Sequence, residues 1–434
     1  MSAKTLYVLV AAAVIALLAA FWISNANQPA SEGSAPDRLL LPHLKDQLND
    51  VDSITLTGAG DKVLVTLKRG ADGWRIAEKS GYPADLAKLR EFLFKLADAT
   101  VLEEKTANPK LYADLGVDDV AGKDAKGVQV TIGGLQQPLK FILGLYNGAG
   151  GGGTFARRDG EAQSLLASGN LLAEKSPAGW LKRDLVNIDS SRIKEVVLTN
   201  LEGKVLRVAK DQSADVNFKV ADVPKGREVA SDYVANSLGS GLANLGIDDV
   251  AAAHDLAPPD KVYKVHYLAF GGTVVDLTAW DANGKNAVQL AASNDAAQLD
   301  ANITAEQAAA KAAYETAVAA AKLKVVEAKG DAAAIAKAEA GVAKPPSMVD
   351  PAKDHAERVA AADKVVEDLN KTFAGWTFTV PAYAFASFNK SMNDMLKPIA
   401  QKTAAGGRTP ALQPAGQPSR GPAVKPAPSP AAGH

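Results

Sequence analysis

One sequence pattern occurs twice in this chain, and this internal repeat limits the possible fold more than any other feature. Residues 51–57 and 62–64, which read VDSITLT and KVL, align without a gap with residues 193–199 and 204–206, which read IKEVVLT and KVL. Each copy of a repeat generally folds into the same supersecondary unit. We therefore expect two related units in tandem, spanning residues 49–190 and 191–400.

The composition agrees with two folded units and excludes several classes of protein. A chain of 434 residues with 47% hydrophobic and 22% charged residues can bury more than one core. Its 48 basic and 49 acidic residues give a formal charge of -1, which does not favour nucleic acid as a partner. The absence of cysteine excludes disulfides, iron–sulfur clusters and thiol nucleophiles. This absence suits an oxidising compartment, and compositional drift explains it equally well.

The N-terminus predicts a membrane anchor. Residues 6–23, LYVLVAAAVIALLAAFWI, form an apolar run close to the ~20 residues that a helix needs to cross a bilayer. Lys4 precedes this run and no basic residue follows it before Arg38, which predicts a cytoplasmic N-terminus and a periplasmic bulk. We expect a retained anchor at residues 1–24 in the inner membrane. The alternative is a signal peptide cleaved near Ser24-Asn25-Ala26.

The apolar pattern of each copy predicts strands followed by a helix and more strands. In the first copy a hairpin turns at residues 58–61, a third strand follows Asp72-Gly73, and a helix starts at Pro83-Ala84-Asp85. The other strands are expected at 128–132, 139–143, 154–157 and 163–166 in this copy, and at 193–198, 204–208, 218–220, 263–270, 273–280 and 287–291 in the second. Tyr233, Leu238, Leu242 and Leu245 predict the second helix. The expected class is α+β, with tandem duplicated antiparallel-sheet-plus-helix domains.

An insertion distinguishes the second copy from the first. Thr304 and Gln307 form a capping box ahead of an alanine-rich helix over 305–329, and residues 355–373 have a complementary apolar seam. Together they predict an antiparallel helical hairpin over 302–373, inserted before a strand at 376–380. The hairpin is either a self-contained decoration or a docking arm for a partner protein.

The remaining segments flank the two copies. Residues 25–48 are expected to form a stalk and a short apolar lead-in. Apolar spacing over 384–396 predicts a final helix that covers the core. The proline- and alanine-rich tail at 401–434 is expected to be disordered.

A search for site chemistry assigns no catalytic, cofactor-binding or metal-ligating residue and no small-molecule ligand. The five histidines, at 43, 254, 266, 355 and 434, include no metalloprotease spacing. The glycine run at 147–154 lacks the Gly-Lys-Ser/Thr of a phosphate loop and predicts a hairpin loop instead. Ser240 lacks a G-x-S-x-G pattern. The pairs Asp118-Asp119 and Asp248-Asp249 could act as acid and base or hold a cation, but neighbouring acids in loops are usually solvated.

Several motifs together resemble one bacterial family. They are the lead-in LLLPHLKDQLNDVDSITL, Asp72-Gly73-Trp74, Pro83-Ala84-Asp85 and Gly179-Trp180-Leu181. The chain resembles the uncharacterised family of domain of unknown function 4340 from the anchor to about Leu396. The resemblance implies a single-pass envelope protein associated with gliding-motility-type ABC transporters. It supplies no catalytic residues.

We therefore expect a non-catalytic extracytoplasmic accessory or scaffold subunit of an ABC-type transport or envelope complex, acting through protein–protein contacts. Its expected partners are a membrane ABC transporter permease or other envelope proteins. One alternative is a polysaccharide- or peptidoglycan-binding module that uses Trp74, Trp180 and Trp280 for stacking. A further alternative is an envelope hydrolase that depends on Asp118 or Asp248.

Overall fold

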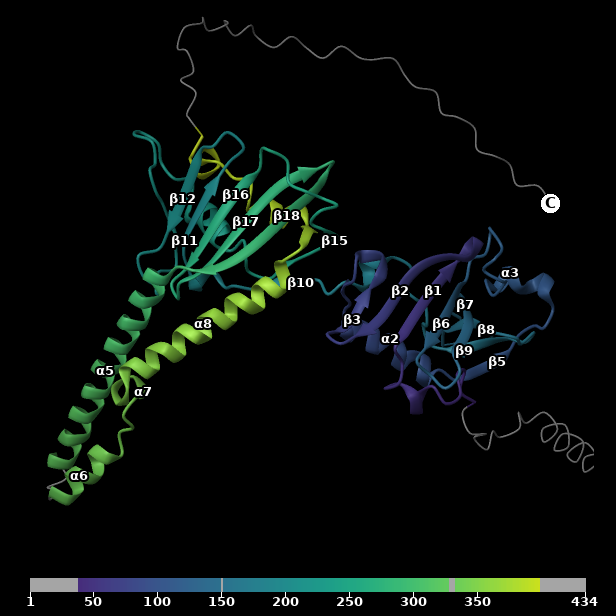
Figure 1. The fold of residues 1–434 in the computed structure, drawn as a ribbon, viewed down its shortest axis with the longest axis horizontal. Coiled ribbons are helices and arrows are strands. Elements are labelled where there is room, and N and C mark those ends of the chain that lie inside the picture. Colours follow the sequence, from purple (N-terminus) through teal and green to yellow (C-terminus); the bar gives the residue numbers. More distant parts are fainter. Residues whose placement is uncertain (1–37, 150, 328–331, 399–434) are drawn as a thin grey trace, which may run out of the picture.

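The computed structural model describes residues 38–149, 151–327 and 332–398, which form two antiparallel sheets, each with its own helix, and a helical arm (Figure 1). The expected α+β class is confirmed. The predicted anchor at 1–24 and the tail at 401–434 lie outside the described residues. Within the described part of the chain, no helix has both the length and the apolar character to cross a membrane.

The first unit is a nine-stranded sheet in the order β4-β3-β2-β1-β6-β7-β8-β9-β5. Its strands are β1 Ser53–Gly58, β2 Lys62–Gly70, β3 Gly73–Ile76, β4 Tyr82–Pro83, β5 Val101–Glu104, β6 Val128–Gly133, β7 Leu139–Asn147, β8 Gly153–Arg158 and β9 Ser164–Ser168. Its helices are α2 Leu86–Asp98, the single turn α3 Tyr112–Leu115, and the 3-10 turns η1 Lys45–Gln47, η2 Ala59–Asp61, η3 Ala77–Lys79, η4 Pro109–Leu111 and η5 Pro177–Trp180.

Local signals explain where α2 begins and which face it buries. The side chain of Asp85 accepts hydrogen bonds from the backbone N–H groups of Ala87 and Lys88, at 2.9 and 3.0 Å. These bonds satisfy two N–H groups that lack a partner within the helix. Pro83, expected in the first helical turn, instead belongs to β4. The buried face of α2 consists of Leu89, Phe92, Leu93, Leu96 and Ala97.

The second unit is an eight-stranded sheet in the order β13-β12-β11-β16-β17-β18-β19-β15. Its strands are β11 Ile193–Thr199, β12 Val205–Ala209, β13 Lys219–Val220, β15 Asp249–Ala252, β16 Tyr263–Ala269, β17 Thr273–Ala282, β18 Lys285–Asn294 and β19 Trp376–Thr379. The turn η6 Ser190–Arg192 precedes β11, and α4 Asp232–Gly239 follows β13. This strand order matches that of the first unit from β3 to β5, and β4 is the additional strand of the first sheet.

A β-bulge changes the register that the sequence repeat predicts. In the first hairpin the register shifts between Leu56 and Thr57, so that Leu56 pairs with Val65. In the second hairpin Leu198 pairs with Leu206. Val65 is therefore the counterpart of Leu206, one residue away from the ungapped alignment. The bulge keeps both side chains buried, whereas a one-residue slip without it would turn one of them toward solvent.

Two features near the ends of the units differ from the expectation. Strands β5 and β15 were not predicted, and each forms the outer edge of its sheet. The helix expected over 384–396 is wrong, because this segment contains two single turns, α9 Ala382–Phe385 and α10 Met392–Met395. Ser391 and Asp394 form a capping box that starts α10 as a separate helix.

The inserted arm lies between β18 and β19 and comprises α5 Ala296–Glu327, α6 Ala332–Ala340, α7 Pro346–Val349 and α8 Pro351–Phe373. The helix α5 begins before the predicted capping box, where the side chain of Asp295 accepts a hydrogen bond from the N–H of Gln298 at 2.9 Å. Thr304 therefore lies inside α5. The arm projects away from the second sheet (Figure 1).

The returning helix α8 packs differently from the predicted seam. The side chain of Asn370 exchanges two hydrogen bonds of 2.8 Å with the backbone of Ala292 in β18, and Phe373 is buried. The last part of the apolar seam of α8, Val366, Leu369 and Phe373, thus packs on the core. Nearer its start, α8 contacts α5 through Asp354, which accepts a hydrogen bond from Gln307 at 2.9 Å. Farther out, α6 packs beside α5, and Lys322 pairs with Glu339 at 2.8 Å.

Buried contacts connect the two units. One continuous cluster of buried apolar residues extends from the first unit into the second. The ring of Tyr82 in β4 lies edge-on to Trp376 in β19, with centroids 5.2 Å apart, and Lys79 forms an ion pair with Asp249. Strand β10 Asp184–Val186, which precedes the expected boundary at residue 190, pairs with β14 Leu245–Gly246 in the second unit.

Candidate functional site

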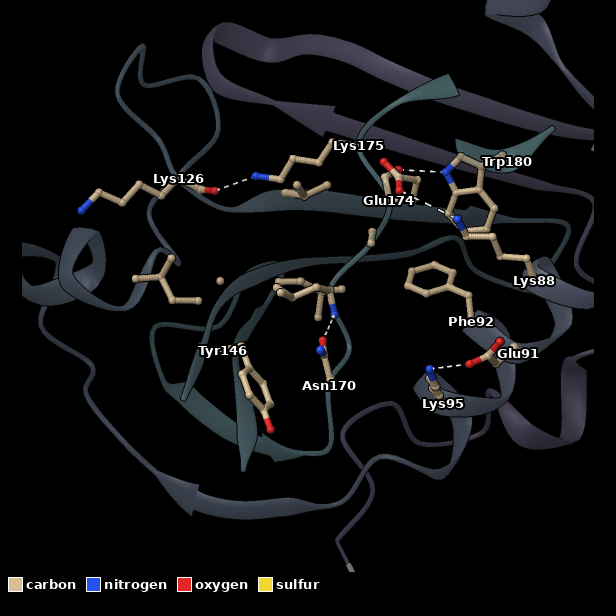
Figure 2. A pocket seen from close by; sticks show the side chains of 16 residues that line it. Lys88, Glu91, Phe92, Lys95, Lys126, Tyr146, Asn170, Glu174, Lys175 and Trp180 are labelled. Atoms are coloured by element: carbon tan, nitrogen blue, oxygen red, sulfur yellow. Dashed lines mark hydrogen bonds and ion pairs between the residues drawn. The ribbon is translucent and has the colours of Figure 1, made fainter. Parts of the chain in front are cut away.

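A groove in the first unit has a volume of about 680 Å³ (Figure 2). It lies between α2, the paired strands β6 and β7, and the segment that follows β9. Its floor is apolar and includes Phe92, Val128, Leu143 and Trp180. Ligand cavities of this size are common in proteins and are mostly lined by apolar side chains.

Three large side chains leave part of the groove wall open to solvent. Leu145, Tyr146 and Leu172 are 39%, 43% and 50% exposed. Single exposed apolar residues are normal, but a group of them around one cavity is typical of a binding surface.

The rim of the groove is basic. It contains Lys88, Lys95, Lys126 and Lys175 against Glu91 and Glu174, so four positive and two negative charges leave a net charge of +2. Lys95 lies 2.6 Å from Glu91, and its hydrogen bond lowers the pKa of that carboxyl group.

Lys88 pairs with Glu174 at 3.8 Å. The two remaining basic groups, Lys126 and Lys175, are not neutralised by acids within the described residues. Lys175 donates a hydrogen bond of 3.1 Å to the backbone oxygen of Lys126. The ammonium group of Lys126 is exposed and has no described partner of its own. These two lysines therefore carry the excess positive charge of the rim.

The wall beside α2 is held by contacts of Trp180. Its indole N–H donates a hydrogen bond of 2.8 Å to the backbone oxygen of Glu174, and its ring lies edge-on to Phe92 with centroids 5.6 Å apart. Lys88 lies over the same ring at 5.5 Å and donates a hydrogen bond of 2.6 Å to the backbone oxygen of Gly179. This network fixes the segment after β9 against α2.

Two glycines, Gly127 and Gly144, allow the turn after α3 to approach strands β6 and β7 closely. A Cβ atom on Gly127 would lie 2.2 Å from the backbone oxygen of Gly116, and one on Gly144 would lie 2.3 Å from that of Leu115. Any larger residue at either position would push the turn after α3 away from β6 and β7. Gly144 lines the groove, and Gly127 precedes the strand β6 that contributes Val128 to it.

Sequence reasoning missed this groove. Its lining residues lie between positions 88 and 180 and come from one helix, two strands and two connecting segments. The one local signal was the spacing of Lys88, Phe92 and Lys95 along a helix, which places their side chains on neighbouring faces.

The structure separates the two carboxylate pairs into different units. Asp119 forms an ion pair with Arg157, and Asp249 forms one with Lys79. One oxygen of Asp118 is buried without a hydrogen-bond partner, and the backbone N–H of Asp248 donates to Thr379 at 2.8 Å. The structure therefore does not bring the two pairs together into one acid–base site.

The histidine and serine candidates make hydrogen bonds within the fold. His266 bonds across the strands to Asp276 at 2.7 Å, and His355 bonds to Asp300 at 3.0 Å. Ser240 ends α4 and donates a hydrogen bond to the backbone oxygen of Asn236. Among the described residues, no group of three or more metal-ligating side chains is gathered. The glycine run forms the connection between β7 and β8, apart from Gly150, which lies outside the described residues.

The three tryptophans differ in exposure. Trp180 and Trp280 are 1% and 3% exposed, so their faces are not available for stacking on a sugar. Trp74 is half-buried and lines a smaller cavity with Leu86 and Phe94.

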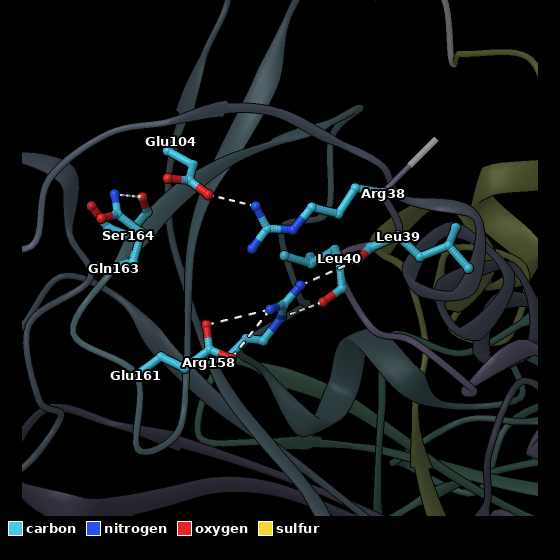
Figure 3. A network of polar contacts seen from close by, with 8 residues as sticks. All are labelled: Arg38, Leu39, Leu40, Glu104, Arg158, Glu161, Gln163 and Ser164. Atoms are coloured by element: carbon cyan, nitrogen blue, oxygen red, sulfur yellow. Dashed lines mark hydrogen bonds and ion pairs between the residues drawn. The ribbon is translucent and has the colours of Figure 1, made fainter. Parts of the chain in front are cut away.

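A polar cluster around Arg158 attaches residues 38–40, at the start of the described chain, to the first sheet (Figure 3). Arg158 donates hydrogen bonds to the backbone oxygens of Leu40 and Leu39, at 2.7 and 3.2 Å, and pairs with Glu161. Leu40 is buried in the core of the first unit, together with Leu41 and Leu44. The described part of the expected stalk and lead-in is thus an integral part of the first unit.

Residues 74–264 match one family model. The matched family is Domain of unknown function (DUF4340). The match begins in β3 and ends in β16, and it supports the resemblance to the DUF4340 family. No curated protein and no solved structure matches this chain.

The DUF4340 match includes the groove but not the arm. All residues that line the groove lie within 74–264, whereas the arm from α5 to α8 lies outside this range. The groove therefore lies within the matched region, and the arm lies outside it.

Proposed function

We propose that this protein is a non-catalytic accessory or scaffold subunit of an ABC-type transport or envelope complex. In this proposal residues 1–24 anchor the chain in the inner membrane, and both sheet units lie outside the cytoplasm. The protein acts through contacts with a membrane permease or with other envelope proteins. The DUF4340 match and the apolar run at 6–23 support this proposal.

The observation that carries the proposal is the projecting arm. The 32 residues of α5 extend over about 48 Å at 1.5 Å per residue. Leu323 and Val326, near the far end, are 64% and 65% exposed. A long helix held to the sheet at its base, with exposed apolar residues at its far end, suits contact with another protein.

The alternatives receive less support from the described side chains. Glycan recognition by stacking requires exposed aromatic faces, but Trp180 and Trp280 are buried. A carboxylate hydrolase would use one neighbouring pair of acids, but Asp119 pairs with Arg157 and Asp249 pairs with Lys79. The scaffold proposal needs neither arrangement.

The experiment compares the full chain with a variant that lacks the outer arm. Replacing residues 308–349 with a short Gly/Ser linker keeps Gln307, Asp354 and the part of α8 that packs on the sheet. Both proteins are cross-linked in native membranes and purified in detergent, and the recovered proteins are identified by mass spectrometry. We expect the full chain to recover a permease and its ATPase and the variant to lose them.

A milder variant controls for damage to the fold. Leu323→Ala with Val326→Ala keeps the helix and removes the two exposed apolar side chains, so it should reduce recovery of the partner without changing the melting temperature. Repeated purification of the full chain with neither a permease nor an ATPase would contradict the proposed function. The genes beside this one provide an independent check, because an ATPase and a permease are expected there.

A further inference from the structure

We infer that the groove of the first unit is a docking site for an acidic polypeptide segment of a partner protein, anchored by an aromatic side chain. This inference concerns a surface other than the arm and does not depend on the proposed transporter partner. It rests on the counterpart of the groove in the second unit, on the charge of the rim and on the exposed apolar wall.

The strand registers identify the counterpart of the groove floor. Leu56 pairs with Val130 in the first sheet, and Leu198 pairs with Val265 in the second. Val130 on β6 and Val265 on β16 are therefore equivalent. Two residues before them on these strands, Val128 in the groove floor corresponds to Tyr263. The two units can be compared position by position at this point.

In the second unit the chain itself contacts this position, and Tyr263 and Phe385 also line a cavity of about 560 Å³. The ring of Phe385 lies edge-on to Tyr263 with centroids 6.3 Å apart, and both Phe385 and Phe388 are buried. They belong to the segment that follows β19, and α10 in the same segment packs near α4. The fold thus accepts a short segment with aromatic side chains between its helix and its sheet.

In the first unit the floor of the groove is buried, and the corresponding segment leaves a cavity above it. The segment after β9 buries Leu171 and Trp180 but leaves Leu172 half exposed, and the cavity of about 680 Å³ remains beside it. Figure 2 shows Phe92 and Tyr146 on opposite sides of this space. A polypeptide from outside the unit can add a further aromatic side chain in this space, beside Trp180 of the unit's own chain.

The positive charge of the groove rim favours binding of an acidic polypeptide segment. The net charge of +2 at the rim favours an acidic segment, because opposite charges across an interface direct association and exclude wrong partners. The tail of this chain is a poor occupant, since residues 401–434 contain Lys402, Arg408, Arg420 and Lys425 and no acidic residue. The occupant is therefore a segment of another protein.

The test uses a peptide based on the segment that fills the second unit. Residues 382–388, AYAFASF, are synthesised with two Asp residues at each end and a fluorescent label. A second peptide carries Lys in place of Asp, and a third carries Ala in place of both Phe residues. Binding to the full chain in detergent is measured by fluorescence anisotropy, at low salt and at physiological salt. We expect the acidic aromatic peptide to bind at least about tenfold more tightly than either control and to weaken with salt.

Charge reversal on the protein locates the binding site. Lys126→Glu with Lys175→Glu should weaken binding of the acidic peptide about tenfold, because it removes the unneutralised charge of the rim. The matched control reverses two exposed lysines of the second unit, Lys225→Glu with Lys264→Glu, and should leave binding unchanged. Both double variants change the net charge equally, and their melting temperatures should equal that of the parent chain.

Three outcomes would overturn the inference. These are no saturable binding of the acidic aromatic peptide, equal effects of the two double variants, and binding that is insensitive to the loss of both Phe residues. Phosphatidylglycerol vesicles and an anionic polysaccharide are tested in parallel. If either one depends on Lys126 and Lys175 while the peptide does not bind, the groove recognises a different class of ligand and the inference is wrong.

Discussion

At the scale of single residues, buried polar groups hold this fold together where distant segments meet. Tyr82 lies between the two units, and Arg158 holds the first described residues against the sheet. Each makes a hydrogen bond to a backbone oxygen more than 90 residues away in the sequence. Removing such a group leaves its buried partner unsatisfied, which generally costs more than the bond itself contributes.

Tyr82 should make stability fall at alkaline pH. Burial raises the pKa of its phenol from 10.0 to about 12, so between these values the unfolded chain loses a proton that the folded chain keeps. This difference favours the unfolded state as pH rises, by about 1 kcal/mol between pH 9 and pH 11. Chemical unfolding across this range should show a smaller loss in Tyr82→Phe than in the parent. Tyr233→Phe, at an exposed position, should follow the parent curve. Equal slopes for parent and Tyr82→Phe would contradict the argument.

Arg158→Ala should loosen the start of the first unit. The variant loses charged hydrogen bonds to Leu39 and Leu40, which are worth about 2–3 kcal/mol in the free energy of unfolding. The amide of Leu40, which donates to Ala99 at 2.7 Å, should exchange its hydrogen faster. Arg90→Ala, at an exposed position of the same unit, should change neither measurement. Unchanged exchange at Leu40 in Arg158→Ala would show that the guanidinium does not hold this segment.

At the scale of secondary-structure elements, the two kinds of helix differ in what stabilises them. Helix α2 has one buried face against its sheet, whereas the apolar residues of α5 are distributed around the helix. An amphipathic helix gains its stability from packing, while an alanine-rich helix relies more on its own propensity. The outer arm can therefore change or be lost without disturbing either sheet.

Two substitutions in α2 should separate its buried face from its exposed face. Leu96 is fully buried, so Leu96→Ala should lower the free energy of unfolding by about 2–5 kcal/mol. Phe94 is 55% exposed on the same helix, and Phe94→Ala should change it by about 0.5 kcal/mol or less. Chemical unfolding followed by circular dichroism measures both. Similar effects of the two substitutions would mean that α2 is not oriented as described.

At the scale of the whole molecule, the two units form one connected body through their shared core. The continuous apolar cluster, the contact of Tyr82 with Trp376 and the β10–β14 pair all cross between them. Two domains joined by a flexible linker would share few such contacts. The groove and the base of the arm therefore belong to one connected body.

The ion pair between Lys79 and Asp249 should couple the units measurably. Both side chains are mostly buried, so a double-mutant cycle with Lys79→Ala and Asp249→Ala should give a coupling energy of about 1 kcal/mol. The cycle is measured by chemical unfolding at low and high salt. Additive single effects would show that the pair contributes nothing across this interface. Lys225→Ala paired with Asp249→Ala provides the control, because Lys225 is exposed and has no described contact with Asp249.

The sequence alone determined the elements whose signals are local. Alternating apolar residues located most strands of both sheets, and Asp85 marked the start of α2, because side-chain period and capping act within a few residues. The same local reasoning misplaced the start of α5 and joined α9 to α10, since a capping box or an apolar spacing can also occur inside or between helices.

Only the tertiary structure decided which distant residues meet. The bulge after Leu56 corrects the register of the first hairpin, and the last part of the apolar seam of α8 packs on the core rather than along α5. The groove joins Lys88, Lys126 and Lys175, which are separated by dozens of residues in the sequence. Such contacts arise from the packing of whole elements, and no local pattern in the chain encodes them.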